Sequence, residues 1–122
     1  MGVNNFRFLD WKVYKDARAL HSIVLKVVGK LPKEYRFELG SQIIRSSFSV
    51  VLNIAEGSGK SSDVEFNRFL NISLGSASET LAAADVLRYN KLIGESEFNL
   101  IYENLSGVIG QLHGFKKKLR KF

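Results

Sequence analysis

One segment of the sequence, NIAEGSGKSS at residues 53–62, resembles part of a phosphate-binding loop. In the P-loop pattern G-x-x-x-x-G-K-S/T, backbone amides and the lysine hold the phosphates of a nucleotide. Gly59, Lys60 and Ser61 fit the end of that pattern, but Ile54 stands where its first glycine belongs. A P-loop also follows a buried strand, and the residues before Gly57 show no strand alternation. The segment therefore favours a connection between two helices, and a nucleotide-using enzyme stays the minor alternative.

The same residues carry signals for the end of one helix and the start of the next. We expect Gly57 and Gly59 to end the first helix in the left-handed conformation that glycine adopts easily. Ser62 and Glu65 have the spacing of a capping box, which begins a helix. The sequence thus predicts a helix on each side of a short connection.

Metal and nucleophilic chemistry find little support elsewhere in the chain. A di-iron carboxylate site needs Glu-x-x-His on two helices, but Arg18 and Gly110 stand three places before His21 and His113. Cysteine is absent, which excludes disulfides, thiolate nucleophiles and cysteine-bound zinc. We therefore expect no metal, no cofactor and no enzymatic activity. The serines on predicted helix faces suit close packing better than catalysis; they are Ser46, Ser47, Ser49, Ser73, Ser76 and Ser78.

One polar strip does have regular spacing. Its four members, three, eight and three residues apart, are Gln42, Arg45, Asn53 and Glu56. We interpret the strip as a structural network of ion pairs and hydrogen bonds that ties its helix to neighbours or to another subunit. A functional site there is the alternative.

Apolar residues recur every three or four positions over long stretches, which is typical of helices. We expect helices over about residues 9–28 and 63–89, one through residues 42–56, and one from Phe98 to the end of the chain. The single proline, Pro32, lies in a polar break between the first two. The sequence predicts one all-α domain over residues 1–122, an antiparallel up-down-up-down four-helix bundle whose first and last helices are neighbours.

The helix through residues 42–56 is apolar around about half of its circumference, more than one core can cover. Ile43, Val50 and Ile54 share the face expected to point inward. We predict that the adjoining flank packs against a second subunit, so that the protein oligomerises. The residues of this flank are Ile44, Phe48, Val51, Leu52 and Ala55.

Charge is segregated along the chain, whose formal net charge is +6. Residues 1–36 carry eight basic and three acidic side chains, residues 104–122 carry five basic and none acidic, and residues 37–103 carry five basic and nine acidic. In an antiparallel bundle the two basic segments lie on adjacent helices and form one positive surface together with Arg7.

Such a surface suits binding to the phosphates of a nucleic acid. Ordinary solvated charge and an anionic membrane remain alternatives, the membrane least favoured because Phe115 and Phe122 are in register with the core. No stretch of eighteen apolar residues or leader occurs, so a cytoplasmic location is expected. The predicted nucleic-acid contacts are Lys12, Lys15, Arg18, Lys116, Lys117, Lys118, Arg120 and Lys121.

Residues 41–79 resemble the four-helix-bundle proteins encoded in intervening sequences of bacterial 23S ribosomal RNA genes. Those proteins typically read SQ-x-x-R, NIAEG, a basic residue with serine, EF-x-x-FL and GS-x-x-E. The chain departs from them at Ile44, where an arginine is frequent, and at Leu52, where a proline is frequent. The matching residues are Ser41, Gln42, Arg45, Asn53, Ile54, Ala55, Glu56, Gly57, Lys60, Ser61, Glu65, Phe66, Phe69, Leu70, Gly75, Ser76 and Glu79.

The resemblance implies a homopentamer without enzymatic activity. It also implies kinship with accessory proteins of diversity-generating retroelements, which are basic pentamers that bind nucleic acid and a partner reverse transcriptase. We therefore expect a non-enzymatic oligomeric bundle that binds structured RNA, or another nucleic acid, through the positive surface. The competing hypothesis is an adaptor that docks a protein, such as a reverse transcriptase, and has no direct nucleic-acid role.

Overall fold

The structure, a computed structural model, describes residues 6–119, and all regular secondary structure in that range is helical. The all-α class predicted from the sequence is confirmed. The elements are a short 3-10 helix η1 (Arg7–Asp10) and the α-helices α1 (Lys12–Gly29), α2 (Lys33–Arg36), α3 (Glu38–Ser58), α4 (Asp63–Tyr89) and α5 (Glu95–Lys118).

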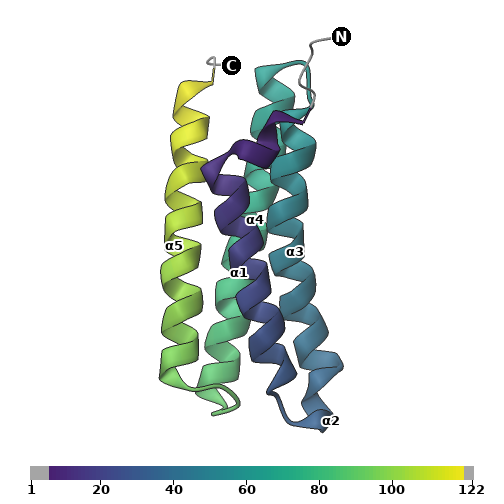
Figure 1. Ribbon diagram of the computed structural model, residues 1–122, viewed down its shortest axis with the longest axis vertical. Helices are drawn as coiled ribbons and strands as arrows, with labels where there is room; N and C mark the ends of the chain where they lie inside the picture. The colour runs from purple at the N-terminus through teal and green to yellow at the C-terminus, as the bar shows by residue number, and fades with distance from the viewer. Residues whose placement is uncertain (1–5, 120–122) are drawn as a thin grey trace.

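The four long helices lie side by side, and each runs opposite to the one before it in the chain (Figure 1). Helix α1 packs against α3 and α5, and α4 packs against the same two helices, with the most extensive contact between α3 and α4. The start of α1 and the end of α5 lie at the same end of the molecule (Figure 1). The first and last long helices are therefore neighbours, as predicted.

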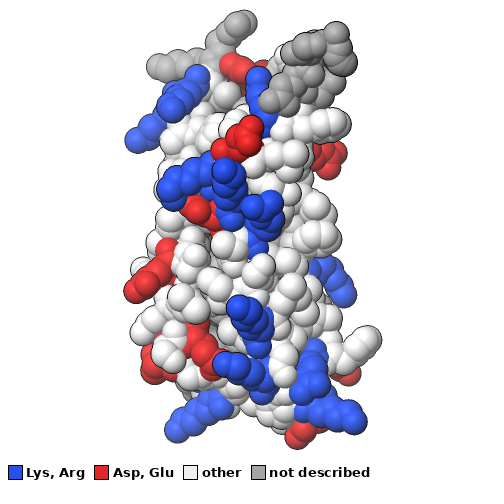
Figure 2. All heavy atoms as spheres, viewed as in Figure 1, with Lys and Arg blue, Asp and Glu red and all other residues white. Residues whose placement is uncertain are grey.

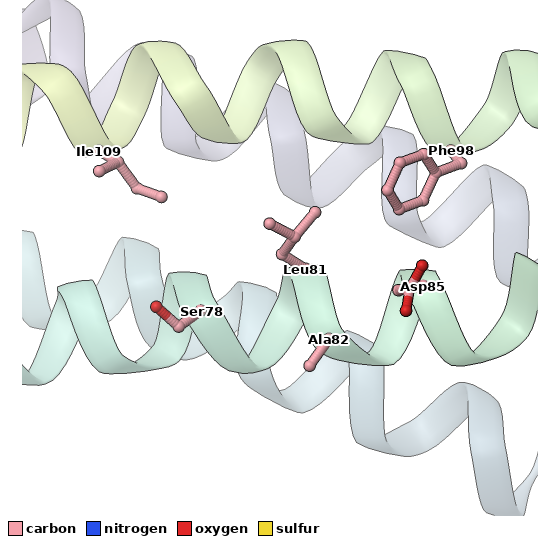
Figure 3. A pocket seen from close by; sticks show the side chains of 6 residues that line it. All are labelled: Ser78, Leu81, Ala82, Asp85, Phe98 and Ile109. Carbon is pink, nitrogen blue, oxygen red and sulfur yellow. The ribbon is translucent and has the colours of Figure 1, made fainter.

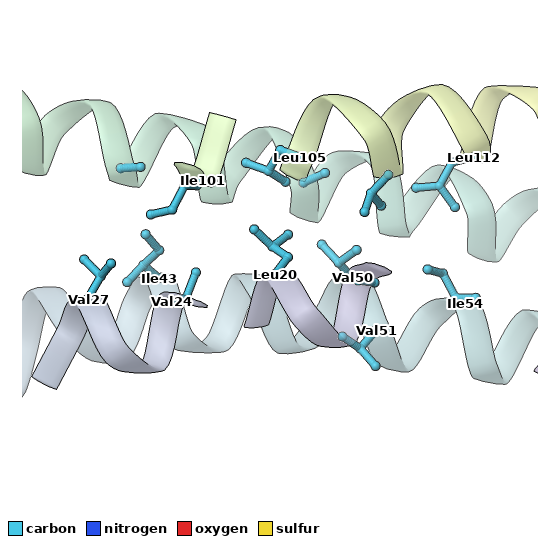
Figure 4. Packing of buried hydrophobic residues seen from close by; sticks show 14 of the residues in the cluster. Leu20, Val24, Val27, Ile43, Val50, Val51, Ile54, Ile101, Leu105 and Leu112 are labelled. Carbon is cyan, nitrogen blue, oxygen red and sulfur yellow. The ribbon is translucent and has the colours of Figure 1, made fainter. Parts of the chain in front are cut away.

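The core occupies the space between the four long helices, where side chains such as Leu20, Ile43 and Leu105 point toward one another (Figure 4). Apolar side chains spaced by three and four along α1 and α5 are buried as predicted. The fully or almost fully buried ones on these two helices are Val13, Ala17, Leu20, Val24, Val27, Phe98, Ile101, Leu105, Val108 and Leu112.

Small hydroxyl side chains join α3 to α4. The hydroxyls of Ser46 and Thr80 lie 2.8 Å apart, and Ser73 donates a hydrogen bond to the carbonyl of Val50 at 2.9 Å. Both Ser73 and Thr80 are fully buried. Small side chains allow the two helices to approach closely, and their hydroxyls are satisfied across the contact. The packing role predicted for the serines is confirmed for the buried Ser46 and Ser73, whereas Ser78 is exposed.

The connection between α3 and α4 differs from the prediction in its glycines. Neither glycine is left-handed: Gly57 lies inside α3, and Gly59 caps the helix with φ −91° and ψ 0°. Gly57 is instead needed for space, because a Cβ there would lie 2.8 Å from the Cβ of Phe69. The predicted start of α4 is correct, since Ser62 Oγ accepts a hydrogen bond from the amide of Glu65 at 3.2 Å.

Helix α1 begins at Lys12, three residues later than predicted, because Trp11 is extended with φ −73° and ψ 134°. Its ring packs against Phe115 at 4.9 Å and Phe66 at 6.0 Å between ring centroids. This cluster joins the starts of α1 and α4 to the end of α5. It therefore sets the position of the last turns of α5 relative to α1.

Candidate nucleic-acid interface

The two basic segments meet along the contact between α1 and α5. Gln111 on α5 donates a hydrogen bond to Asp16 Oδ2 on α1 at 2.8 Å, one to two turns from the contact of Trp11 with Phe115. Lys and Arg side chains follow the face over α1 from one end of the molecule toward the other (Figure 2). Acidic side chains are drawn along both edges of this face and near its two ends (Figure 2). The structure thus places much of the positive charge on one elongated face.

The three predicted contacts on α1 differ in their surroundings. Lys12 Nζ lies 2.6 Å from Asp16 Oδ2, and this hydrogen bond is the main cause of the lowered pKa of Asp16. The guanidinium of Arg18 lies over the ring of Tyr14, 5.5 Å from its centroid. Lys15 is exposed and forms no ion pair with another described residue. Lys15 is therefore the most available of the three for a phosphate.

The lysines at the end of α5 differ in their surroundings. Lys116 Nζ donates a hydrogen bond to Asn71 Oδ1 on α4 at 2.5 Å, so this side chain faces away from α1. Lys117 and Lys118 are exposed and follow it in the last turn of the helix. Arg120 and Lys121 lie outside the described residues. Only two of the predicted contacts on the tail are thus shown to be open to solvent.

Two further basic residues belong to the same face and were missed in the sequence. Lys26 lies eleven residues after Lys15 on α1, about three helical turns, so both project from the same side, roughly 16 Å apart along the axis. Lys30 follows directly after α1 and lies 4.0 Å from Glu97 Oε2. The periodicity of basic residues along the polar side of α1 is the signal that could have found them.

Of the four residues of the polar strip, Asn53 is linked to a neighbouring helix. Its Nδ2 donates to the carbonyl of Ser49 at 2.8 Å and to Ser49 Oγ at 3.0 Å, and Ser49 Oγ lies 2.8 Å from Ser76 Oγ on α4. Glu56 lies 3.9 Å from Lys60. Gln42 and Arg45 are exposed and contact no partner among the described residues through a hydrogen bond or an ion pair. Gln42, Arg45 and Glu56 are therefore open to solvent, whereas Asn53 is half-buried.

The apolar flank of α3 is partly open. The side chains of Phe48 and Leu52 are 47% and 48% exposed, and those of Ile44 and Ala55 are half-buried. Val51, predicted to contact another subunit, is 6% exposed and belongs to the core. Its position lies between the outward and inward faces of α3, so Val51 is removed from the predicted flank.

His21 on α1 lies beside this flank and contacts Phe48 and Ser47 on α3. Its ring stacks on Phe48 with 5.1 Å between centroids, and Nδ1 lies 2.8 Å from Ser47 Oγ. Ser47 Oγ donates to the carbonyl of Ile44, so in the neutral ring Nδ1–H donates to Ser47 and Nε2 carries no proton. Burial lowers the pKa of His21 below its ordinary value of 6.5.

Other parts of the described chain offer little for catalysis. A shallow pocket of about 370 Å³ between α4 and α5 is lined by apolar side chains such as Leu81, Phe98 and Ile109 (Figure 3). Its one acidic group, Asp85, is paired with Arg88 at 2.5 Å.

Within residues 6–119 no cluster of three or more His, Asp and Glu side chains has the arrangement of a metal site. Over the same range, no helix has the length and apolar character needed to cross a membrane.

Lys60 does not lie in a phosphate-binding loop. It follows a helix and not a strand, its ammonium lies 5.0 Å from the ring centroid of Phe69, and it is near Glu56. The strand that precedes a P-loop is absent from the described residues.

Comparison with known proteins agrees with this geometry. The model of the family described as 23S rRNA-intervening sequence protein matches residues 9–114. The chain belongs to this family. A crystal structure from Bacteroides thetaiotaomicron, described as a protein of unknown function from the S23 ribosomal protein family, has a similar fold. Its TM-score is 0.81 at 23% identity, over 87% of this chain and 99% of that chain. A comparison with curated proteins gives no match.

In this member of the family, the NIAEG segment that carries the resemblance lies at the contact of α3 with α4. Ile54 is buried in the core, and Gly57 faces Phe66 and Phe69 of the EF-x-x-FL segment. These parts of the motif therefore serve packing. The basic face over α1 is formed by residues outside the motif.

Proposed function

We propose that the protein is a non-enzymatic, cytoplasmic RNA-binding protein, and that its four long helices form an antiparallel four-helix bundle that is the unit of a homo-oligomer. The observation that supports RNA binding is the elongated positive face, on which Lys15, Lys26 and the end of α5 carry exposed ammonium groups. Phosphates are the ligands that such a face fits best, because their binding releases counterions and needs no base-specific contact.

The family description provides a second reason to favour RNA, since it refers to intervening sequences of 23S rRNA. An elongated basic face of helices, without a helix aimed at a major groove, suits the backbone and shape of folded RNA better than a base sequence. We therefore expect affinity for structured RNA with weak sequence preference.

Oligomerisation is supported by the exposed Phe48 and Leu52, which lie one turn apart on α3 beside the half-buried Ile44 and Ala55. A soluble chain that leaves such a flank uncovered favours association with another surface. A pentamer is the state that we favour on family grounds. A ring would repeat the basic face in every subunit and so raise the effective affinity for a long RNA.

The test is a salt titration of binding to a labelled RNA hairpin. For the wild type, the logarithm of the affinity should fall linearly with the logarithm of salt, with a slope of about −0.7 to −0.9 per phosphate contacted. The variant Lys15→Gln/Lys26→Gln should bind more weakly and make the slope about 2 units shallower. Its matched control removes the same charge from Lys60 and Arg68, which lie near Phe69 and away from α1.

Two outcomes would contradict the proposal. If the wild type ignores both RNA and DNA at about 50 mM salt while its oligomer persists, the adaptor hypothesis replaces RNA binding. Equal loss of affinity in the variant and in its control would mean that net charge matters and the face over α1 does not. Nucleotide hydrolysis that disappears with Lys60→Ala would restore the enzyme hypothesis.

A further inference from the structure

The segment between α1 and α3 exposes an aromatic ring among basic side chains. Leu31 is buried and α2 follows it, with Arg36 Nη2 donating a hydrogen bond to the carbonyl of Leu31 at 3.1 Å. Phe37, next in the chain, is 83% exposed, and Tyr35 is 42% exposed. Exposure of an apolar ring to water is unfavourable, so a flat apolar surface that covers Phe37 would lower the free energy.

Phe37 also borders a pocket. A hollow of about 570 Å³ opens between the end of α1, α2 and the start of α3. Its floor is apolar, with Val28 and Ile44, and its rim carries the two basic side chains Lys33 and Arg36. No acidic side chain is among its lining residues, which are Val28, Lys33, Arg36, Phe37, Ser41 and Ile44.

We propose that this pocket, hereafter the α2 pocket, binds an unpaired nucleobase of a bound RNA. This inference rests on the proposed function. The base stacks on Phe37, while Lys33 and Arg36 contact the flanking phosphates. Proteins that hold single strands combine cations for the backbone with aromatic rings for the bases, and this is the combination that the α2 pocket presents.

The basic rim distinguishes this occupant from a protein partner. Lys33 and Arg36 line the α2 pocket, and Lys26 is exposed in the last turns of α1, whose Val28 also lines it. Lys30 is turned instead toward Glu97 at the start of α5. Glu34 and Glu38 are also nearby, but neither lines the pocket. An apolar protein segment would leave Lys33 and Arg36 without counter-charges, whereas a nucleotide supplies both the ring and the phosphate.

The two parts of the surface then recognise different parts of one RNA. Along α1 between Lys12 and Lys30, the aromatic side chains Tyr14 and His21 are half-buried. Tyr14 meets Phe8 edge to face, and His21 stacks on Phe48. That stretch fits the phosphates of a duplex. The α2 pocket fits a single-stranded flank of the same duplex.

The experiment compares two RNAs, a blunt hairpin and the same hairpin with a single-stranded extension, for the wild type and Phe37→Leu. Leucine keeps an apolar side chain and removes the stacking ring. We expect Phe37→Leu to lose about 5- to 150-fold in affinity for the extended hairpin and little for the blunt one, because stacking of one base on an aromatic ring is worth about 1–3 kcal/mol. The salt slope should not change, since no phosphate contact is lost.

The matched control is Tyr89→Leu, because Tyr89 is 84% exposed at the end of α4 and does not line the α2 pocket. It should bind both RNAs as the wild type does. In Phe37→Trp, the fluorescence of the new indole should be quenched by the extended hairpin and not by the blunt one.

The inference is overturned if Phe37→Leu loses the same affinity for both hairpins, or for neither. It is also overturned if the substitution lowers the solution mass, because a second copy of the chain then covers the pocket. If the wild type binds neither hairpin, the proposed function and this inference are both overturned. If the wild type binds both hairpins with equal affinity, only this inference is overturned.

Discussion

Gly57 on α3 faces Phe69 on α4 so closely that an added methyl group would lie 2.8 Å from the Cβ of Phe69. Real Cβ atoms do not come this close, and Phe66 crowds the same space at 3.0 Å. The backbone of α3 thus takes the place that a side chain would need. The glycine in the segment that resembles a P-loop is explained by packing between two helices and not by a nucleotide.

Gly57→Ala should therefore destabilise the fold by about 1–3 kcal/mol, the usual cost of overpacking. Gly59→Ala is the matched control, because a Cβ there meets only the carbonyl of Glu56 at 3.7 Å and the backbone is right-handed. It should be neutral or stabilise by up to about 1 kcal/mol. Urea unfolding of both variants measures the difference, and equal stabilities would refute the packing role of Gly57.

Three glycines on α5 have the opposite surroundings. An alanine Cβ at Gly107, Gly110 or Gly114 would meet no atom within 4 Å. Gly110→Ala should therefore raise the free energy of unfolding by about 0.5–1 kcal/mol, since glycine is a poor helix former. If thermal unfolding shows a loss of stability, or if the oligomer dissociates, the backbone of another molecule approaches α5 at this point.

The ion pair between Lys12 and Asp16 reduces the charge available to RNA. Asp16→Asn should raise affinity for an RNA hairpin and make the salt slope about 1 unit steeper, because it frees Lys12 for a phosphate. The loss of fold stability should stay below about 1 kcal/mol, as is usual for exposed pairs. The control is Glu79→Gln, at an exposed position on α4. It removes the same charge and should change the affinity for RNA less than Asp16→Asn does. If both variants gain the same affinity in a hairpin titration, the effect comes from net charge and not from a contact of Lys12 with a phosphate.

His21 should make stability depend on pH. Because burial lowers its pKa in the folded chain below 6.5, the unfolded chain binds more protons as the pH falls through that value. The contribution is thus present above pH 6.5 and is lost as the pH falls toward the folded pKa. Urea unfolding between about pH 7.5 and pH 5.5 should show decreasing stability for the wild type and a weaker trend for His21→Gln. His113→Gln, at an exposed position on α5, is the control that keeps the wild-type trend.

A charged side chain on the open flank of α3 tests whether this flank contacts another subunit. Phe48→Glu should give a lower solution mass with unchanged helix content, because Phe48 is 47% exposed and the folded chain tolerates a polar group there. Val64→Asp, at an exposed position in the first turn of α4, should leave the mass unchanged. A wild type that is already a single chain at high concentration would end the oligomer proposal.

Local patterns in the sequence were enough to predict the helices and most of the core. Ser62 caps α4 and sets its first residue, and the seam of α5 from Phe98 to Leu112 is buried as its spacing indicates. Such features depend on residues within one or two turns of each other. A single chain segment therefore carries them, whatever packs against it.

Features that depend on a second helix were decided only by the tertiary structure. Val51, Phe48 and Leu52 are all apolar and lie on one flank, yet only Val51 is covered by a neighbour. Lys116 and Lys118 are two residues apart, yet only Lys116 reaches Asn71 on α4. The physical reason is that burial and pairing depend on which helix stands opposite, and that distance in space is not encoded in the spacing along one helix.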